Sequence, residues 1–175
     1  SFCARRAPIT AIAALALGGA AVGLAGCGSD EAEDPPDGLS ADAVLTALVS
    51  WTVQSEALPT TDAAEPPVVY IAPASGETIG AGVQAAVVAA TDGEATVRFA
   101  DDKSEAFDDT SDDQAVHDDG VLLVVGALPS DESTTTSATA EVQVEWYRSP
   151  DDTGLYVVEF ATTADGATVT GVTAG

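Results

Sequence analysis

The chain is poor in positive charge. Its 175 residues include five Lys+Arg against 29 Asp+Glu, which gives a formal net charge of −24. Proteins bind nucleic-acid backbones by neutralising phosphates with Lys and Arg, so nucleic acid is not expected as a partner. Anionic lipid headgroups repel such a chain too, and membrane attachment therefore requires a hydrophobic or covalent device. The acidic excess is expected to keep the protein soluble and to oppose its association.

Histidine and cysteine are scarce as well. His117 is the only histidine, and Cys3 and Cys27 are the only cysteines. Structural zinc sites draw their four ligands mainly from these two residue types, so no zinc site is expected. A Ser-His-Asp triad is not expected either, because His117 lies in an acidic stretch and the chain has no Gly-x-Ser-x-Gly motif. The sequence therefore assigns no catalytic residue, no metal ligand and no cofactor.

The first residues have the composition of an export signal. Arg5 and Arg6 give a basic start, residues 7–26 carry no charge, and the first acidic residue is Asp30. A basic start and an apolar run that ends in small residues are typical of a secretory signal peptide. The run approaches the roughly 20 residues of a transmembrane helix, which is the alternative interpretation. Its high Ala and Gly content disfavours both helix formation and burial in lipid, so we expect residues 1–26 to be a signal peptide.

The apolar run closes on Leu24-Ala25-Gly26-Cys27. This tetrapeptide resembles the lipobox of bacterial lipoproteins, in which an aliphatic residue and two small residues precede a cysteine. The resemblance implies that the Cys27 thiol receives a diacylglyceryl group and that a peptidase cuts after Gly26. Cys27 would then be the first residue of the mature protein, and its acyl chains would include palmitate. The resemblance leaves open whether the new N-terminus carries a further acyl chain. The resemblance also implies a lipid-anchored location on the outer side of the cytoplasmic membrane.

Cleavage after Gly26 would change both charge and cysteine content. Loss of Arg5 and Arg6 lowers the net charge by two, from −24 to −26, and loss of Cys3 leaves no partner for a disulfide. Burial of acyl chains contributes about 0.8 kcal/mol per CH₂, and one chain holds only marginally, so two chains on Cys27 would make the attachment stable. The arginine pair leaves open whether export follows the general or the twin-arginine route.

The mature part divides into a tether and one domain. Residues 27–39 contain the acylated cysteine, five acidic residues and Pro35-Pro36, which is typical of an extended linker. Residues 40–175 are expected to form a single α+β domain, with two N-terminal helices packed on a C-terminal antiparallel β-meander. Hydrophobic spacing predicts helices at 41–55 and 78–91, and short strands at 68–71 and 96–99. Alternation predicts the meander strands 121–125, 140–147 and 155–161, with a tight turn at Asp165-Gly166.

Two features of the sequence, the acidic stretch 101–119 and Trp51, bear on whether the domain binds a ligand. The acidic stretch 101–119 fails as a calcium loop, because Lys103 and Ala106 stand where an oxygen ligand and a glycine are required. A solvated loop is expected, and loose binding of calcium by residues 108–113 is the alternative. Trp51 flanks the first helical face and is interpreted as a half-buried core residue, with a ligand platform as the alternative. We therefore expect a non-enzymatic binding or envelope-associated role with an unknown ligand. The alternative is a surface hydrolase that uses paired carboxylates, with or without a divalent cation.

Overall fold

Six strands make up one mixed sheet in the part of the chain that the structure describes. In this computed structural model the described residues are 38–55, 66–108, 114–129, 138–164 and 166–175. They all belong to one of the two units into which the chain divides, Glu33–Gly175. The predicted signal peptide, Cys27 and nearly all of the predicted tether therefore lie outside the described residues.

The first half of the sheet is parallel. Strand β1 (Val68–Pro73) pairs with β2 (Thr96–Phe99) on one side and with β3 (Val121–Val125) on the other, in the same direction in both cases. Helix α2 (Ala81–Ala90) connects β1 to β2. All five residues of β3 are buried, because the sheet is covered on both faces there.

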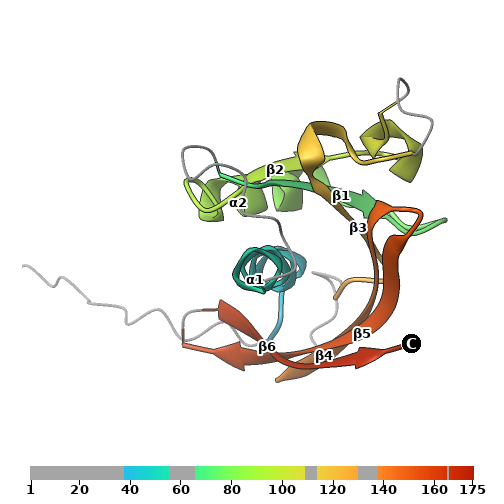
Figure 1. Cartoon of the computed structure of the whole chain (residues 1–175). Helices are drawn as coiled ribbons and strands as arrows, with labels where there is room; N and C mark the ends of the chain where they lie inside the picture. The colour runs from blue at the N-terminus through green and yellow to red at the C-terminus, as the bar shows by residue number, and fades with distance from the viewer. Residues whose placement is uncertain (1–37, 56–65, 109–113, 130–137, 165) are drawn as a thin grey trace, which may run out of the picture. The chain divides into compact units, whose positions relative to one another are not determined.

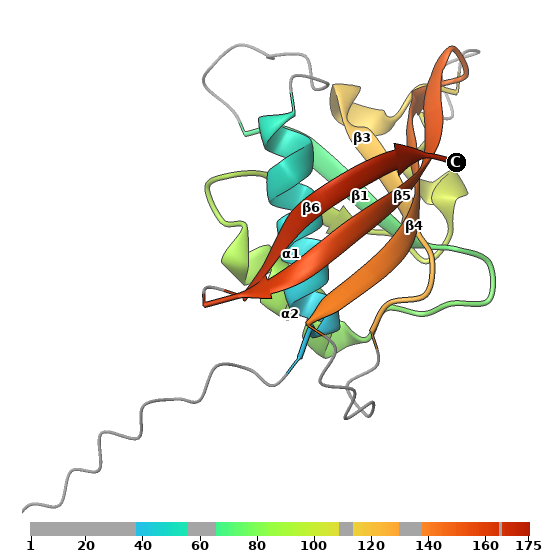
Figure 2. The same cartoon turned by 90° about the horizontal axis from the view of Figure 1, so that it is seen from below.

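The second half is antiparallel. Strands β4 (Thr139–Ser149), β5 (Asp152–Thr163) and β6 (Gly166–Ala174) follow β3 as neighbours, so the strand order is β2-β1-β3-β4-β5-β6. The sheet curves around helix α1 (Ala41–Gln54), and β6 is its last strand (Figures 1 and 2). Gly166, at the start of β6, has a φ of 117°, a conformation that favours glycine. Asp165, the other residue of the predicted turn, lies outside the described residues.

Helix α1 forms where the sequence predicts it. Ser40 is the N-cap, and its Oγ accepts a hydrogen bond of 3.4 Å from the N–H of Ala43. Asp42 lies in the first turn, where its negative charge interacts favourably with the helix dipole. The predicted inner face is buried in the concave side of the sheet, and its members are Leu45, Leu48, Val49 and Thr52.

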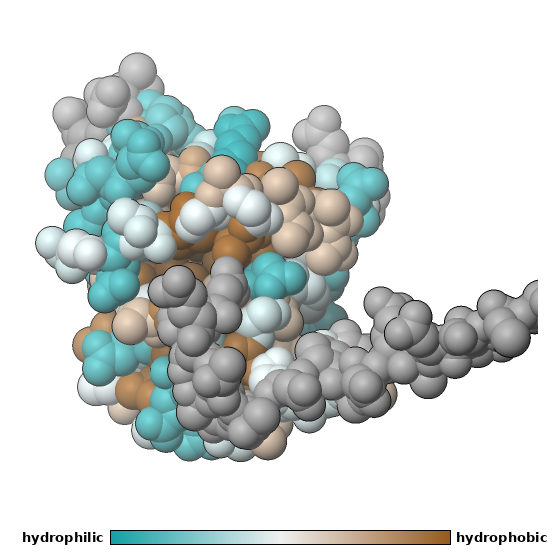
Figure 3. Space-filling view, turned by 180° about the vertical axis from the view of Figure 1, so that it is seen from behind, coloured by the Kyte–Doolittle hydropathy of each residue, from teal (hydrophilic) through white to brown (hydrophobic). Residues whose placement is uncertain are grey.

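Helix α2 differs from its prediction. It begins at Ala81, three residues after the predicted start, and Val87 is its only buried residue. Ala86 and Ala90 of the predicted inner face are exposed, as is Val88 at 46%. Nine of the ten residues of AGVQAAVVAA are uncharged and small or aliphatic, so the sequence has no polar face from which to infer the orientation of the helix. The view from behind shows hydrophobic residues gathered between hydrophilic ones (Figure 3).

Two hydrophobic clusters stabilise the sheet, one on each face. The larger cluster lies on the concave side between the sheet and the two helices, with Phe160 and Ile71 fully buried. The smaller one lies under the stretch 101–119, whose described parts contain two 3₁₀ turns, Lys103–Ala106 and His117–Asp119. Asp118 and Asp119 have φ values of 57° and 51°, in the left-handed region that aspartate tolerates.

The predicted fold class is therefore correct in its coarse form. The described residues contain two α-helices and one largely antiparallel sheet, which is an α+β arrangement. The expected simple meander does not describe this sheet, because β1 and β2 join it and pair in parallel beside β3. Strand pairing between segments this distant along the chain leaves no local sequence pattern.

Candidate binding groove

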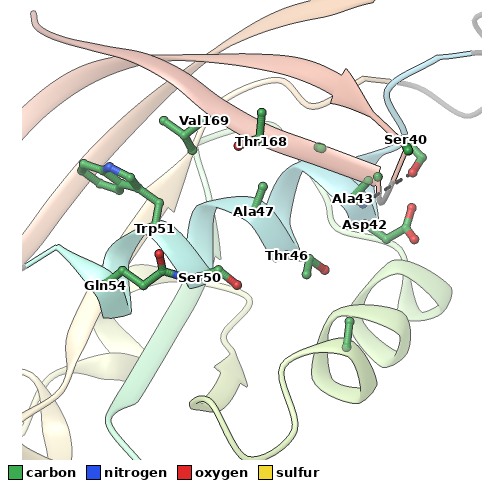
Figure 4. Close-up of a pocket in the computed structure, with 14 residues that line it drawn as sticks. Ser40, Asp42, Ala43, Thr46, Ala47, Ser50, Trp51, Gln54, Thr168 and Val169 are labelled. Carbon is green, nitrogen blue, oxygen red and sulfur yellow. Dashed lines mark hydrogen bonds between the residues drawn. The ribbon is translucent and has the colours of Figure 1, made fainter. Parts of the chain in front are cut away.

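An open groove runs along the solvent side of α1. Its volume is about 890 Å³, which lies within the range of roughly 300–1,000 Å³ that is common for ligand sites. Residues of α1 form the floor, the start of β6 forms one wall, and Ala90 at the end of α2 contributes to the other (Figure 4). The lining consists of Ser40, Asp42, Ala43, Thr46, Ala47, Ser50, Trp51, Gln54, Ala90, Ala164, Gly166, Ala167, Thr168 and Val169.

The floor of the groove is built from residues of α1, most of which are small. Ala43, Ala47 and Trp51 follow one another at helical spacing and point toward β6 (Figure 4). Trp51 is half-buried and packs against the larger hydrophobic cluster, and it also lines the groove. The two interpretations of Trp51 from the sequence, core residue and ligand platform, are therefore compatible with its position.

Among the described strands, β6 is the last of the sheet, and its edge lies beside the groove. Along a strand that lies between two antiparallel neighbours, successive residues direct their main-chain N–H and C=O groups alternately to one neighbour and to the other. The Thr162 N–H donates to the Ala138 carbonyl at 2.9 Å, so the main-chain groups of Thr162 point to β4 and those of Ala161 point to β6. Thr168, the partner of Ala161, is therefore bonded to β5.

The main-chain groups next to Thr168 consequently face outward. Ala167 and Val169 direct their N–H and C=O groups to the free edge, while their half-buried side chains face α1. The Gly175 N–H donates to the Leu155 carbonyl of β5 at 2.8 Å. The main-chain groups of β6 therefore alternate in the same way at the other end of the strand. Val172 and Ala174 therefore also direct their main-chain groups outward. These four residues form the outward edge of β6.

The groove carries little charge in an otherwise acidic chain. Asp42 is the only charged residue among the described residues that line it. Glu94 lies close by, since the Ser50 hydroxyl donates to its carboxylate at 2.9 Å. The positively charged residues of the described chain do not line the groove: Arg98 pairs with Asp118, Lys103 with Glu145, and Arg148 with Asp152. The electrostatic character of the groove is thus neutral along its floor and negative at its rim.

A second polar cluster joins β1 and β2 to the 3₁₀ turn at 117–119. Arg98 donates to the Tyr70 hydroxyl at 2.7 Å and pairs with Asp118, and the Tyr70 hydroxyl lies 3.2 Å from the same carboxylate. The hydrogen bond with Tyr70, followed by the charges nearby, raises the pKa of Arg98 above its ordinary value. Arg98 therefore stays charged. Its N–H groups donate to Tyr70 and to Asp118, and these contacts hold the left-handed turn at 117–119 in place.

The residues singled out for chemistry in the sequence are not brought together. His117 is half-buried in its 3₁₀ turn, on the other face of the sheet from α1. In the described ranges no group of three or more His, Cys, Asp or Glu side chains could hold a metal ion, and part of the acidic run 108–113 lies outside them. Within the same ranges the buried polar side chains are Thr52 and Thr91, and no carboxylate is among them.

Gly26, the predicted cleavage position, and Cys27, the predicted site of lipidation, lie outside the described residues. Among the helices that the structure describes, none is both long and apolar enough to cross a lipid bilayer. The groove itself was not predicted from the sequence. The one available signal was the stretch 166–175, which has no charged residue in a chain with 29 Asp+Glu.

Comparisons of the chain with protein-family models, with curated proteins and with solved structures find no match. Its function must therefore be inferred from its own residues.

Proposed function

We propose that this protein is an extracytoplasmic lipoprotein that is anchored by acyl chains on Cys27 and binds a ligand in the groove between α1 and β6. The observation that carries the binding role is the groove, whose uncharged floor contrasts with the acidic remainder of the chain. The lipobox-like tetrapeptide supports the anchor, and the acidic run that follows it supports a tether between the membrane and the domain.

The hydrolase alternative receives no support from the described residues. A glycosidase-type mechanism needs a pair of carboxyl groups, one of which is kept protonated by burial or by its neighbour. Each described Asp and Glu is at least partly exposed, and the groove is lined by Asp42 alone among them. We therefore propose a binding role without a catalytic residue, a metal or a cofactor.

Membrane fractionation in a bacterial host tests the anchor. The wild-type chain is expected in the membrane fraction and should incorporate tritiated palmitate. Cys27→Ser should lose the label and leave the membrane fraction, because it removes the thiol that accepts the lipid. Cys3→Ser is the matched control, since it removes a cysteine from the segment expected to be cleaved, and it should behave like the wild type. Retention of Cys27→Ser in membranes would contradict the anchor.

Trp51 fluorescence tests the groove. The chain has two tryptophans, so a Trp146→Phe background leaves Trp51 as the single reporter. Three probe classes are titrated: short peptides, hexose oligosaccharides and fatty acids. A ligand in the groove should change the Trp51 emission, and Thr46→Lys, which places a long side chain in the groove, should abolish that change. If no probe class affects Trp51, the binding site is assigned to the wrong place.

A further inference from the structure

We propose that the ligand of the groove is an extended, positively charged peptide segment that adds a strand to β6. This inference rests on the binding role proposed above and specifies its ligand class. Strand addition to a free sheet edge is a recurring mode of peptide recognition, in which main-chain hydrogen bonds supply affinity and alternate side chains supply specificity. Three properties of the described residues support it: the edge, the floor and the charge.

The edge of β6 is open to pairing. Proteins usually protect an edge strand by making it short, by placing Lys or Pro in it, by a β-bulge, or by covering it. Strand β6 has nine residues, GATVTGVTA, with no charged residue and no proline. The register shifts opposite Glu159 and Phe160, which leaves Thr170 without a pairing partner and limits the regular edge beside the groove to Gly166–Val169. Ala167 and Val169 offer their N–H and C=O groups there.

The floor of the groove fits the side chains of an added strand. The sheet already curves around α1, so a strand beside β6 would continue that curve over the solvent side of the helix (Figure 1). Alternate side chains of a strand point to the same face. Those of the added strand would therefore contact Ala43, Ala47 and Thr46, which are small enough to leave the groove unfilled.

The charge distribution selects a cationic peptide. Asp42 and Glu94 lie at the rim, whereas the floor is neutral, so a peptide with uncharged residues between Lys or Arg ends is complementary. A second copy of this chain is the other conceivable strand donor. It would bring a further net charge of −24 to an already acidic surface, which opposes pairing between copies.

Three capped peptides with matched sequences test the proposal on the mature protein, purified from membranes in a neutral detergent. The first is Lys-Val-Thr-Val-Thr-Val-Lys, the second has Glu at both ends, and the third is the first peptide with every backbone nitrogen methylated. The first peptide should bind and shift Trp51 emission. The second should bind at least tenfold more weakly. The third should not bind, because it keeps the side chains but cannot donate main-chain hydrogen bonds.

Variants locate the contact. Thr46→Lys should weaken binding of the first peptide at least tenfold, whereas Thr153→Lys makes the same charge change outside the groove and should leave binding unchanged. Asp42→Asn should weaken binding severalfold, and its matched control Asp151→Asn should not. The melting temperature of each variant shows whether its fold is intact, and Asp42→Asn keeps the test informative if Thr46→Lys does not fold.

Some results would overturn the peptide proposal. Equal binding of the methylated peptide would exclude strand pairing. Sedimentation of the peptide-free protein as a β6-linked dimer would assign the edge to a second copy. If an oligosaccharide or a fatty acid shifts Trp51 and none of the peptides does, the groove is a binding site for another class. That last result would reject the peptide and leave the proposed function standing.

Discussion

The two edges of the sheet differ in length and in chemistry. Strand β2 has four residues, and its side chain Arg98 is held in an ion pair with Asp118. Strand β6 has nine residues without a charge, and two of its outward residues, Ala167 and Val169, line an open groove. Natural proteins protect edges against pairing because unpaired main-chain groups bind other strands. The short, charged edge at β2 is therefore protected, and the long, uncharged edge at β6 is the one that we assign to binding.

The largest expected effect is on the free energy of unfolding, when a side chain that packs next to each edge strand is shortened. Phe160 is fully buried on β5 and pairs with Val169 of β6, whereas Val97 on β2 is only half-buried. Phe160→Ala should lower the free energy of unfolding by about 3–5 kcal/mol, because it removes a large buried side chain and leaves a cavity. Val97→Ala should cost about 1 kcal/mol, since less apolar area is removed from the core. Urea denaturation measures both, and equal losses would show that the two edges are supported alike.

The next effect is on binding. Val172 belongs to the outward edge of β6 and is 37% exposed, so a lysine there can extend into solvent at a small loss of packing. Val172→Lys should weaken binding of the Lys-ended peptide by about tenfold, equivalent to about 1.4 kcal/mol. Arg98→Ala, which alters the other edge, should leave the affinity unchanged. Isothermal titration measures both variants, and a loss of affinity in Arg98→Ala alone would move the site to β2.

A smaller effect is expected from the ion pair of β2. The side chains of Arg98 and Asp118 are 49% and 50% exposed, so solvent screens their attraction. Arg98→Ala should lower the free energy of unfolding by about 0.2–1 kcal/mol, as is typical of exposed pairs. Comparison with Arg98→Lys, which keeps the charge and loses the planar fork, separates charge from geometry. A loss of several kcal/mol in urea would mean that the Arg98 cluster supports the fold far more than its exposure indicates.

The smallest effect is a dependence of stability on alkaline pH. Burial, and then the charge of Glu145, raises the pKa of Tyr147, which packs against Phe107 on the smaller cluster. A group whose pKa is higher in the folded state stabilises the fold below its unfolded pKa and loses that contribution as pH rises through the folded value. Stability should therefore fall slightly above about pH 10. The melting temperature of Tyr147→Phe should fall less above this pH than that of the wild type. If both melting temperatures depend on pH in the same way, Tyr147 does not contribute to the decline.

Local patterns were sufficient for some elements and insufficient for others. Helix α1 and strand β3 were predictable, because Ser40 marks the helix start and Val121–Val125 is an unbroken apolar run. The burial of α2 was not, since its nine uncharged small or aliphatic residues have no polar face. The parallel pairing of β1 with β3 was not predictable either, because it depends on packing between distant segments. The groove follows from that arrangement, so its residues could be found only in the fold.

Amide hydrogen exchange along β6, with and without the Lys-ended peptide, tests the binding edge most directly. In the free protein the amide of Thr168 should exchange slowly, since it is bonded to β5, and those of Ala167 and Val169 should exchange fast. The account predicts that the peptide slows exchange at Ala167 and Val169 and leaves β2 unchanged. Peptide binding that slows exchange at β2, or at no outward amide of β6, would contradict it.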